Sequence, residues 1–420
     1  MRFCMLTTFY PPYHFGGDAV GIQRLVHALA RRGHGVEVIH DADAWRSLAR
    51  RPDPTAPAEP PDPEGVRVHR LESRLGLLSP LLTQQSGRPL VHGRRIRRIL
   101  EAGRFDVIHY HNVSLVGGPG ILALGEAAKL YSAHEHWLVC PSHVLWRHGR
   151  EPCTGRQCLR CVLRHRRPPQ LWRATGLLER RLHHVDVFLA MSEFSRAKHR
   201  EFGFPREMEV LPYFLPEDAP APAAAAEPPH ERPYFLFVGR LERLKGLHEV
   251  IPLWRDPPPA DLLVVGTGGQ EAELRAQAAD LPGVRFLGRV DDELLARCYR
   301  HALALVIPSL CFETFGIIAI EAFARGVPVV ARRRGPLTEI VESSGGGELF
   351  ETEAECRAAL VRLATDGAHR DGLARAGEAA WRERWTEEPV LERYLDIARG
   401  AVAGRAARRS TGGSEACARS

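Results

Sequence analysis

The strongest constraint on the fold is a linker-like stretch that separates two runs of alternating strand and helix patterns. Residues 216–229 read PEDAPAPAAAAEPP and have no apolar periodicity, which is typical of a linker. Before this stretch, strand patterns stand at 3–9, 36–39, 66–71, 107–109 and 187–191, with a helical pattern at 19–32. After it, strands and helices alternate from 234 to 330. Alternation of this kind implies parallel sheets covered by helices.

We therefore predict an α/β fold of two doubly wound, Rossmann-like domains, with a ligand crevice between them at the carboxyl ends of the strands. The predicted domains span residues 1–212 and 233–385, with a linker at 213–232. Residues 53–63 are rich in proline and are expected to form a loop. Residues 405–420 are mostly small or polar and are expected to form a disordered tail.

Composition and charge narrow the class of protein. The 420 residues are 44% hydrophobic and 26% charged, which is typical of globular chains. The sequence contains no run of 18 or more apolar residues, so we expect no transmembrane helix. The first residues do not resemble a secretory signal, and we therefore expect a cytoplasmic protein. The net charge of +6 suits anionic partners such as nucleotide phosphates. Basic segments at 94–98 and 164–167 fit peripheral contact with an anionic membrane, although solvated helix faces are the commoner explanation.

One motif with chemical meaning lies between Phe312 and Pro328, after an apolar strand pattern. A helix is expected to open at Phe315 and Gly316, where free backbone N–H groups favour an anion. Glu313 then lies at the mouth of the crevice, and Glu321 lies about two helical turns further on. Carboxylates at these places can accept hydrogen bonds from sugar hydroxyls. The alternative is an ordinary amphipathic helix with a solvated Glu321.

A second motif follows the first strand pattern after the linker. Here Gly239 turns the chain, and Arg240 and Lys245 stand five residues apart at the entry to the next helix. A guanidinium can fork onto phosphate oxygens, whereas an ammonium supplies a point charge, so the two can stabilise a diphosphate leaving group. Lys245 is one of only three lysines among 57 basic residues, which weakly favours a specific role over a plain basic helix start.

Together these segments resemble the large retaining glycosyltransferase family with two Rossmann-like domains, which is glycosyltransferase family 4 of the GT-B architecture. That family includes sucrose synthases and mannosyltransferases. The resemblance covers residues 2 to about 400, and its most specific parts are Glu313 to Glu321 and Gly239 to Gly246. It also implies that a C-terminal helix at 386–404 crosses back to the first domain.

The resemblance implies a donor site for a nucleotide diphosphate sugar. Gly16 and Gly17 match the glycine loop that lets backbone amides approach the diphosphate, and Arg240 and Lys245 match the diphosphate clamp beside Gly239. Read from the sequence alone, the alternative is that the two glycines form only a simple βα turn.

The resemblance assigns further residues to the sugar and the ribose. His134 looks like the histidine that touches the donor sugar and the reaction site, and Glu313 matches the glutamate beside that sugar. Glu321 matches the carboxylate that binds the ribose hydroxyls, and Phe315 and Gly316 would present amides to sugar and phosphate. The catalytic candidates are therefore His134, Glu313, Arg240 and Lys245. One departure is Glu135, since the family usually has aspartate after this histidine.

A cluster of four cysteines distinguishes this chain. Cys140, Cys153, Cys158 and Cys161 follow the spacing C-x12-C-x4-C-x2-C, which can close a tetrahedral zinc site. We predict a structural zinc in an insertion of the first domain, with His143 or His148 as alternative ligands. The alternative is a set of scattered reduced cysteines in a loop. A catalytic zinc is not expected at the cysteines, because four candidate protein ligands leave no open coordination position, and catalysis is expected to need no divalent ion.

The sequence thus predicts a hexosyltransferase of polysaccharide biosynthesis or a related pathway, which works with retention and without a cofactor. Its partners would be a nucleotide diphosphate sugar and a sugar or lipid-linked acceptor. One alternative is a nucleotide-sugar epimerase on the same pair of domains. A basic nucleic-acid-binding protein is a more distant alternative, because aromatic and basic residues are not interleaved on one surface.

Overall fold

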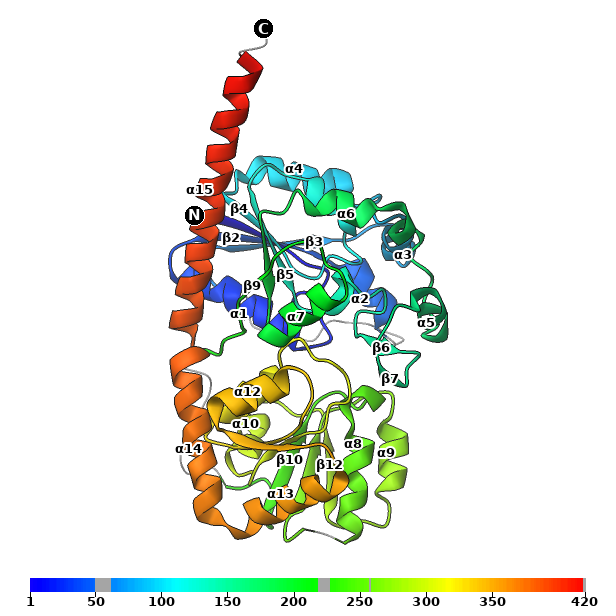
Figure 1. Ribbon diagram of the computed structural model, residues 1–420, viewed down its shortest axis with the longest axis vertical. Coiled ribbons are helices and arrows are strands. Elements are labelled where there is room, and N and C mark those ends of the chain that lie inside the picture. The colour runs from blue at the N-terminus through cyan, green and yellow to red at the C-terminus, as the bar shows by residue number, and fades with distance from the viewer. Residues whose placement is uncertain (50–61, 218–226, 257, 418–420) are drawn as a thin grey trace.

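The computed structural model describes residues 1–49, 62–217, 227–256 and 258–417. Two α/β domains lie one above the other along the long axis of the molecule, and a C-terminal helix runs beside the upper one (Figure 1). Most of the predicted proline-rich loop at 53–63 lies outside the described residues, as does the centre of the predicted linker at 213–232. The proposed domain boundaries therefore remain predictions.

The N-terminal domain is built on a seven-stranded sheet of order β3-β2-β1-β4-β5-β8-β9, in which every pairing is parallel. Its strands are β1 (Arg2–Leu6), β2 (Gly35–Asp41), β3 (Val66–Leu71), β4 (Val107–Tyr110), β5 (Ala128–Ala133), β8 (Val187–Ala190) and β9 (Glu209–Val210). Its α-helices are α1 (Gly17–Arg31), α2 (Ala42–Leu48), α3 (Leu78–Ser86), α4 (Gly93–Gly103), α5 (Cys158–Arg164), α6 (Leu177–Leu182) and α7 (Glu193–Glu201). A short antiparallel hairpin, β6 (Trp146–Arg147) and β7 (Glu151–Pro152), precedes α5.

The C-terminal domain is built on a six-stranded parallel sheet of order β12-β11-β10-β13-β14-β15. Its strands are β10 (Tyr234–Val238), β11 (Asp261–Val265), β12 (Val284–Gly288), β13 (Leu305–Ile307), β14 (Val329–Arg332) and β15 (Gly347–Phe350). Its α-helices are α8 (Leu247–Val250), α9 (Glu271–Gln277), α10 (Asp292–Arg300), α11 (Ile317–Phe323), α12 (Pro336–Ser344), α13 (Glu353–Thr365) and α14 (Gly367–Arg384). In both sheets the strand order reverses beside the first strand, where later strands are added on its other side. This switch point is typical of doubly wound sheets, so the predicted fold class is confirmed.

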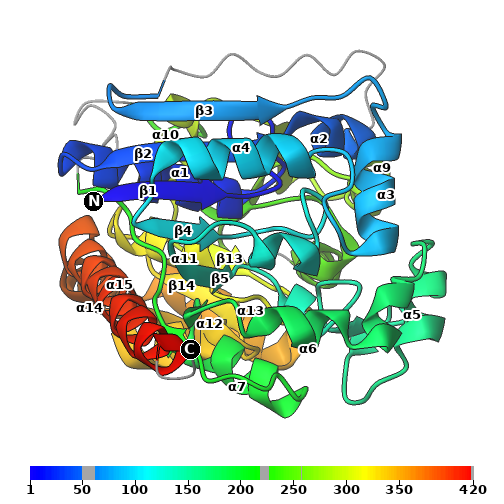
Figure 2. The same cartoon turned by 90° about the horizontal axis from the view of Figure 1, so that it is seen from above.

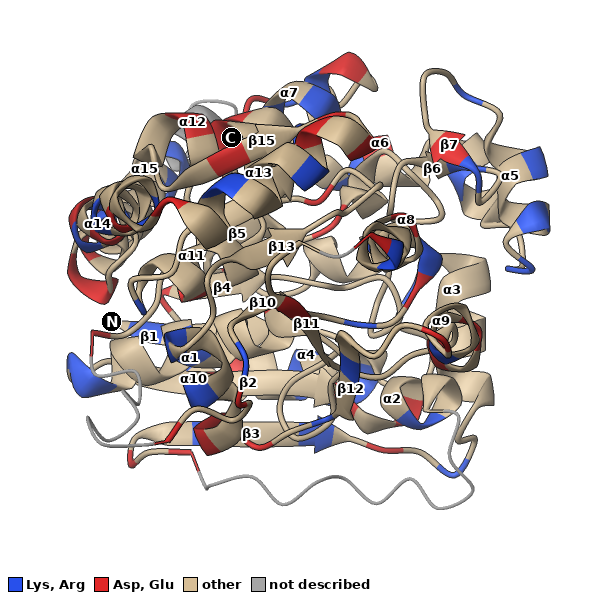
Figure 3. Cartoon of the chain, turned by 90° about the horizontal axis from the view of Figure 1, so that it is seen from below, with Lys and Arg blue, Asp and Glu red and all other residues tan. Residues whose placement is uncertain are grey.

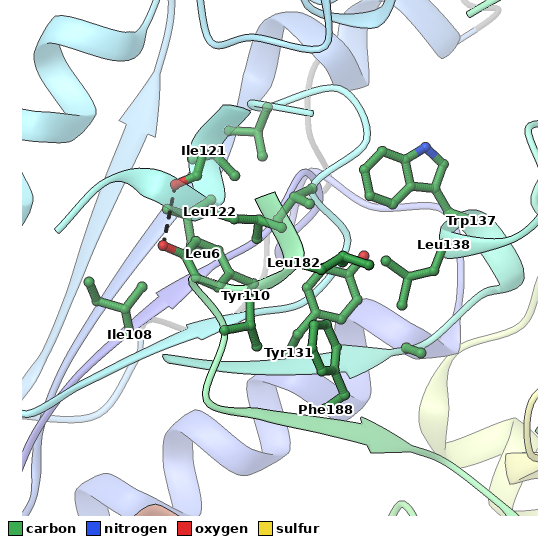
Figure 4. Close-up of a cluster of buried hydrophobic side chains, with 14 of the residues drawn as sticks. Leu6, Ile108, Tyr110, Ile121, Leu122, Tyr131, Trp137, Leu138, Leu182 and Phe188 are labelled. Carbon is green, nitrogen blue, oxygen red and sulfur yellow. Dashed lines mark hydrogen bonds between the residues drawn. The ribbon is translucent and has the colours of Figure 1, made fainter. Parts of the chain in front are cut away.

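Each sheet is covered by apolar side chains, which explains why its strands read as continuous hydrophobic runs. In the N-terminal domain, one core cluster joins Leu6, Tyr131 and Phe188 to the buried Trp137 beyond β5 (Figure 4). Within this cluster, the hydroxyl of Tyr110 donates to the carbonyl of Ile121 at 3.3 Å, so the polar end of the Tyr110 side chain has a hydrogen-bond partner. Among the described residues, no helix is both long and apolar enough to cross a bilayer.

The C-terminal helix α15 (Glu387–Cys417) packs on the N-terminal domain and extends further than the sequence indicates. Leu391 and Tyr394 of this helix are fully buried against that domain, as the predicted crossing helix requires. Beyond residue 404, where a disordered tail is expected, the helix continues instead. Arg405 Nη1 lies 3.2 Å from Asp186 Oδ2, and Arg409 Nη2 lies 2.8 Å from Glu126 Oε2. These ion pairs hold the polar end of α15 against the N-terminal domain, and composition alone gives no sign of them.

We predict that Asp186→Ala lowers the free energy of unfolding by about 1–3 kcal/mol, because the buried Lys129 amide and the α15 arginines lose one acceptor. Urea unfolding monitored by circular dichroism measures this change. Asp396→Ala is the matched control, since its carboxylate pairs with Arg399 on an exposed face and should change the value by under ~0.5 kcal/mol. Equal effects of the two variants would contradict the structural role of Asp186.

Candidate active site

The centre of the candidate site is a hydrogen-bonded ion pair at the carboxyl end of the second sheet. Lys245, at the end of the short 3-10 helix after β10, donates from Nζ to Glu313 Oε1 at 2.8 Å. The Ser309 hydroxyl donates to the same oxygen at 2.6 Å. Gly246 adopts φ +73°, and a Cβ there would lie 2.0 Å from the Pro308 carbonyl oxygen. A glycine is therefore required to bring the lysine loop against the end of β13.

Electrostatics keep both members of this pair ionised. Burial raises the pKa of the Glu313 carboxyl, but the charge and hydrogen bond of Lys245 and the Ser309 hydroxyl outweigh it, so the net pKa lies below the ordinary value. Burial lowers the pKa of Lys245, but Glu313 more than offsets that effect, and the net pKa is raised. A carboxylate and an ammonium are therefore held ready at the domain interface at neutral pH.

Arg240 lies near this pair but does not bond to it. Its guanidinium donates to Glu242 Oε1 at 2.9 Å, and 57% of its side chain is exposed. It nevertheless acts electrostatically on Glu313, Lys245 and the partly buried Asp18 of the other domain. The arginine is thus a solvent-accessible cation whose charge acts on groups of both domains, and its place in the phosphate clamp stays a prediction.

The glycine loop of the first domain meets the second domain here. Gly16 is the N-cap of α1, and a Cβ on Gly17 would lie 3.3 Å from Cγ2 of Ile317 at the start of α11. The next residue, Asp18, has a pKa raised mainly by burial and next by the Glu135 carboxylate. Residues separated by about 300 positions in the sequence are therefore packed against each other at the interface.

His134 follows β5 and is fixed by three neighbours. Its Nε2 lies 2.8 Å from His111 Nδ1, and its Nδ1 lies 2.5 Å from the Tyr213 hydroxyl. Its carbonyl accepts a hydrogen bond from Thr314 Oγ1 of the second domain at 2.9 Å. Burial lowers the pKa of His134 to about 3, so the ring is neutral at physiological pH. One ring nitrogen then donates and the other accepts, and the ring orientation is fixed.

The remaining predicted donor residues stand on or before α11. Phe315 is buried, and its ring meets Tyr213 edge-on with 5.7 Å between centroids. Gly316 adopts φ +109° at the start of α11, a conformation that favours glycine. Glu321 accepts from Arg24 Nη2 of the first domain at 3.3 Å and from the Tyr299 hydroxyl at 3.4 Å. The carboxylate predicted to bind ribose is therefore paired with a cation across the interface.

Sequence reasoning missed the residues that hold these groups in place. They are Arg24, His111, Tyr213, Ser309 and Thr314. One signal was available for His111. The pattern His109-Tyr110-His111 ends the buried strand β4, which pairs with β5, the strand that His134 follows. The others join segments far apart in sequence, and no local pattern indicates them.

The four cysteines do not form the predicted zinc site. Cys158 and Cys161 lie in the first turn of α5, and Cys140 and Cys153 flank the β6–β7 hairpin. A tetrahedral site needs its ligand atoms close together, yet in the described part of the chain the one group of three ligands within 4.8 Å lies elsewhere. The Cys153 thiol donates to the Gly155 carbonyl at 3.3 Å, and Cys161 Sγ accepts from the His148 amide at 3.3 Å. The zinc prediction is therefore not supported.

Comparison with known proteins assigns both halves of the chain. Residues 15–218 match the family described as "Glycosyltransferase Family 4", and residues 222–380 match "Glycosyl transferases group 1". The chain is 30% identical over 396 residues to a glycogen synthase of Mycobacterium tuberculosis (strain ATCC 25618 / H37Rv), covering 87% of this chain and 86% of that protein. The chain belongs to this glycosyltransferase family. It is a retaining hexosyltransferase that uses a nucleotide sugar, and catalysis in the family generally needs no metal ion.

Other relatives and solved structures agree with this assignment. A phosphatidyl-myo-inositol mannosyltransferase of Mycolicibacterium smegmatis is 28% identical over 390 residues, covering 89% of each chain. A sucrose-phosphate synthase structure from Thermosynechococcus elongatus matches the fold with a TM-score of 0.73 at 22% identity, covering 96% of this chain and 99% of that one. The Anabaena HepE structure in complex with UDP-glucose matches with a TM-score of 0.66 at 18% identity, covering 95% and 100%. The glycosyltransferase family therefore shares this two-domain architecture.

We predict that His111 is a positioning residue for His134. His111→Phe should lower kcat for sugar transfer about tenfold or more, with KM for the nucleotide sugar within about twofold, because the His134 ring loses the partner that fixes its tautomer and orientation. Steady-state kinetics with the nucleotide sugar measure both constants.

Two further variants separate positioning from stability. His111→Asn keeps a polar atom near the position of Nδ1 and should restore most of the activity. His69→Phe removes a histidine that pairs with Glu37 elsewhere on the sheet, and it should leave kcat unchanged. Equal losses in His111→Phe and His111→Asn would argue against the hydrogen bond as the cause.

Proposed function

We propose that this glycosyltransferase moves a hexose from a nucleoside diphosphate sugar to a cell-envelope, glycolipid, polysaccharide or small-molecule acceptor in the cytoplasm. The observation that carries this proposal is the pair of Lys245 and Glu313 at the carboxyl end of the second sheet, with Arg240 beside it. The cations neutralise the diphosphate as its bond to the sugar breaks. Glu313 orients the sugar by accepting from its hydroxyls.

The proposed roles require an exchange of partners when the donor binds. Glu321 turns from Arg24 to the ribose hydroxyls, and Glu313 shares its oxygens between Lys245 and the sugar. The amides at Phe315, Gly316 and the Gly16–Gly17 loop face the phosphates and the sugar. The departing phosphate takes the acceptor proton on the face that the acceptor attacks, so no enzyme nucleophile is needed and the configuration is retained.

The acceptor is proposed to bind on the N-terminal domain. Phe15, next to the glycine loop, keeps 39% of its surface exposed and stacks on Trp45 with 6.1 Å between ring centroids. An exposed aromatic ring of this kind offers an apolar face to a sugar ring. The glycogen synthase and phosphatidyl-myo-inositol mannosyltransferase among the relatives are consistent with a polysaccharide or lipid-linked acceptor.

Peripheral contact with an anionic membrane is part of the same proposal. Leu159 and Leu163 on α5 expose 61% and 57% of their surfaces beside the exposed Arg160 and Arg164. Helix α5 lies at one edge of the molecule and carries several Lys or Arg positions (Figure 3). Apolar side chains flanked by arginines are the combination that suits an acidic lipid surface. The segment that carries the four cysteines, residues 140–161, would then dock the enzyme on the membrane surface, and the proposal assigns it no zinc.

The donor is tested by a screen of nucleoside diphosphates and their sugars. A matching ligand should raise the melting temperature, because it binds only the folded chain, and transfer should be seen only when an acceptor is added. Consumption of the donor without any acceptor would favour the nucleotide-sugar epimerase. Tight, salt-dependent binding of duplex DNA in place of nucleotides would favour the nucleic-acid-binding alternative.

We predict that Lys245→Ala lowers kcat/KM for transfer at least about 100-fold, because the diphosphate loses a cation where charge develops. Arg240→Ala should have a similar effect. Because Arg240 is exposed, its loss should leave the melting temperature within about 2 °C. Arg243→Ala is the matched control in the same loop and should keep wild-type kinetics. Wild-type turnover in Arg240→Ala and Lys245→Ala would remove both residues from the diphosphate clamp.

A further inference from the structure

A second polar cluster lies in the N-terminal domain, away from the residues assigned to the donor. It is formed by Asp41 at the end of β2, Asp43 in the first turn of α2, and His92 at the N-cap of α4. One ligand atom from each residue lies within 4.8 Å of the other two. All three residues are nine-tenths or more buried, at 0%, 1% and 5% exposure. Three such groups drawn from separate segments form a compact, enclosed donor set.

Among the described residues, two atoms of the cluster have no hydrogen-bond partner of good geometry. Asp41 uses Oδ1 to accept from the Ala44 amide at 3.1 Å, but its Oδ2 is buried and unpaired. His92 Nε2 is also buried and makes no hydrogen bond of good geometry, and its one close polar contact is Asp43 Oδ2 at 3.5 Å in the part of the chain that the structure describes. Leaving two buried polar atoms unsatisfied costs free energy, so each calls for an explanation.

The donors and the cation around Asp43 compensate only part of the negative charge of the two carboxylates. The Ser73 amide and hydroxyl donate to its Oδ2 at 2.9 and 2.7 Å, and Arg46 Nη1 lies 3.7 Å from its Oδ1. In the ranges that the structure describes, Asp41 forms no ion pair with a cation. Positive charge is therefore deficient at Asp41, next to the buried imidazole of His92.

We propose that Asp41, Asp43 and His92 bind one divalent first-row transition-metal ion, of the Mn²⁺, Co²⁺ or Zn²⁺ class. Two carboxylates and one imidazole are a donor set that such ions accept, whereas Mg²⁺ and Ca²⁺ prefer oxygen ligands alone. The ion satisfies the free Asp41 oxygen and the free His92 nitrogen at once, and it balances the buried negative charge.

The ion has a structural role that bears on the acceptor side of the enzyme. It joins the start of α2 to the start of α4, which are separated by about fifty residues in sequence and both belong to the N-terminal domain (Figure 2). Helix α2 carries Trp45, which packs edge-on against Tyr13 and stacks on Phe15 beside the glycine loop. Fixing α2 therefore fixes the aromatic surface to which the acceptor is proposed to bind.

The test is a Mn²⁺ titration of the full chain after treatment with chelator. Mn²⁺ is the probe because cysteine thiolates are poor ligands for it, so the cysteine segment does not compete. We expect about one Mn²⁺ per chain by electron paramagnetic resonance, a raised melting temperature, and nitrogen coupling from one imidazole in the pulsed spectrum. Asp41→Asn and His92→Gln should each weaken binding at least about tenfold.

Glu72→Gln is the matched control, because Glu72 is a nearby carboxylate that pairs with Arg46 and is not part of the cluster. It should bind Mn²⁺ as the wild type does. No saturable binding of Mn²⁺, Co²⁺ or Zn²⁺ by the wild type at millimolar concentration would overturn the proposal. Binding without nitrogen coupling, or equal binding by His92→Gln, would also overturn it. The wild-type spectrum decides the matter even if the variants fail to fold.

Discussion

The hydrogen-bonded pair of Lys245 and Glu313 is the interaction on which the interpretation of this glycosyltransferase depends. A carboxylate in so enclosed a place would take up a proton unless a cation stood against it, and Lys245 supplies that cation at 2.8 Å. The Ser309 hydroxyl fixes the same oxygen from the other side. Because Glu313 stays ionised, it can accept hydrogen bonds from a sugar, and because Lys245 stays charged, it can receive a diphosphate.

The two-domain fold positions this pair opposite the groups of the first domain. Thr314, next to Glu313, donates to the carbonyl of His134, and Gly17 packs on Ile317. Leu215 and Thr386 form a bridge where the chain passes twice between the domains, and α15 is anchored on the first domain by Tyr394. The interface is thus determined jointly by the active-site loops and by the crossing helix.

Much of the fold could be predicted because the signals are local. The apolar runs that end at glycines or at polar loops gave the strands, and the motifs at Gly239–Gly246 and Glu313–Glu321 indicated the donor side. What escaped prediction depends on long-range contacts. The pairing of Arg24 with Glu321 joins residues 297 positions apart, and no pattern in either segment reveals it. The same holds for Arg405 with Asp186, and for the cysteines, whose spacing suggested a zinc site that the folded positions of the sulfurs do not form.

The pairing of Arg24 with Glu321 adds one more step to this account. Both carboxylates proposed to bind the donor are already neutralised by protein cations, Glu313 within its own domain and Glu321 across the interface. In the proposed donor complex, hydroxyls that bind Glu321 compete with Arg24, which belongs to the domain proposed to bind the acceptor. Binding of the nucleotide would then change a contact that joins the two domains, and the proposed roles thus couple donor binding to domain arrangement through this ion pair.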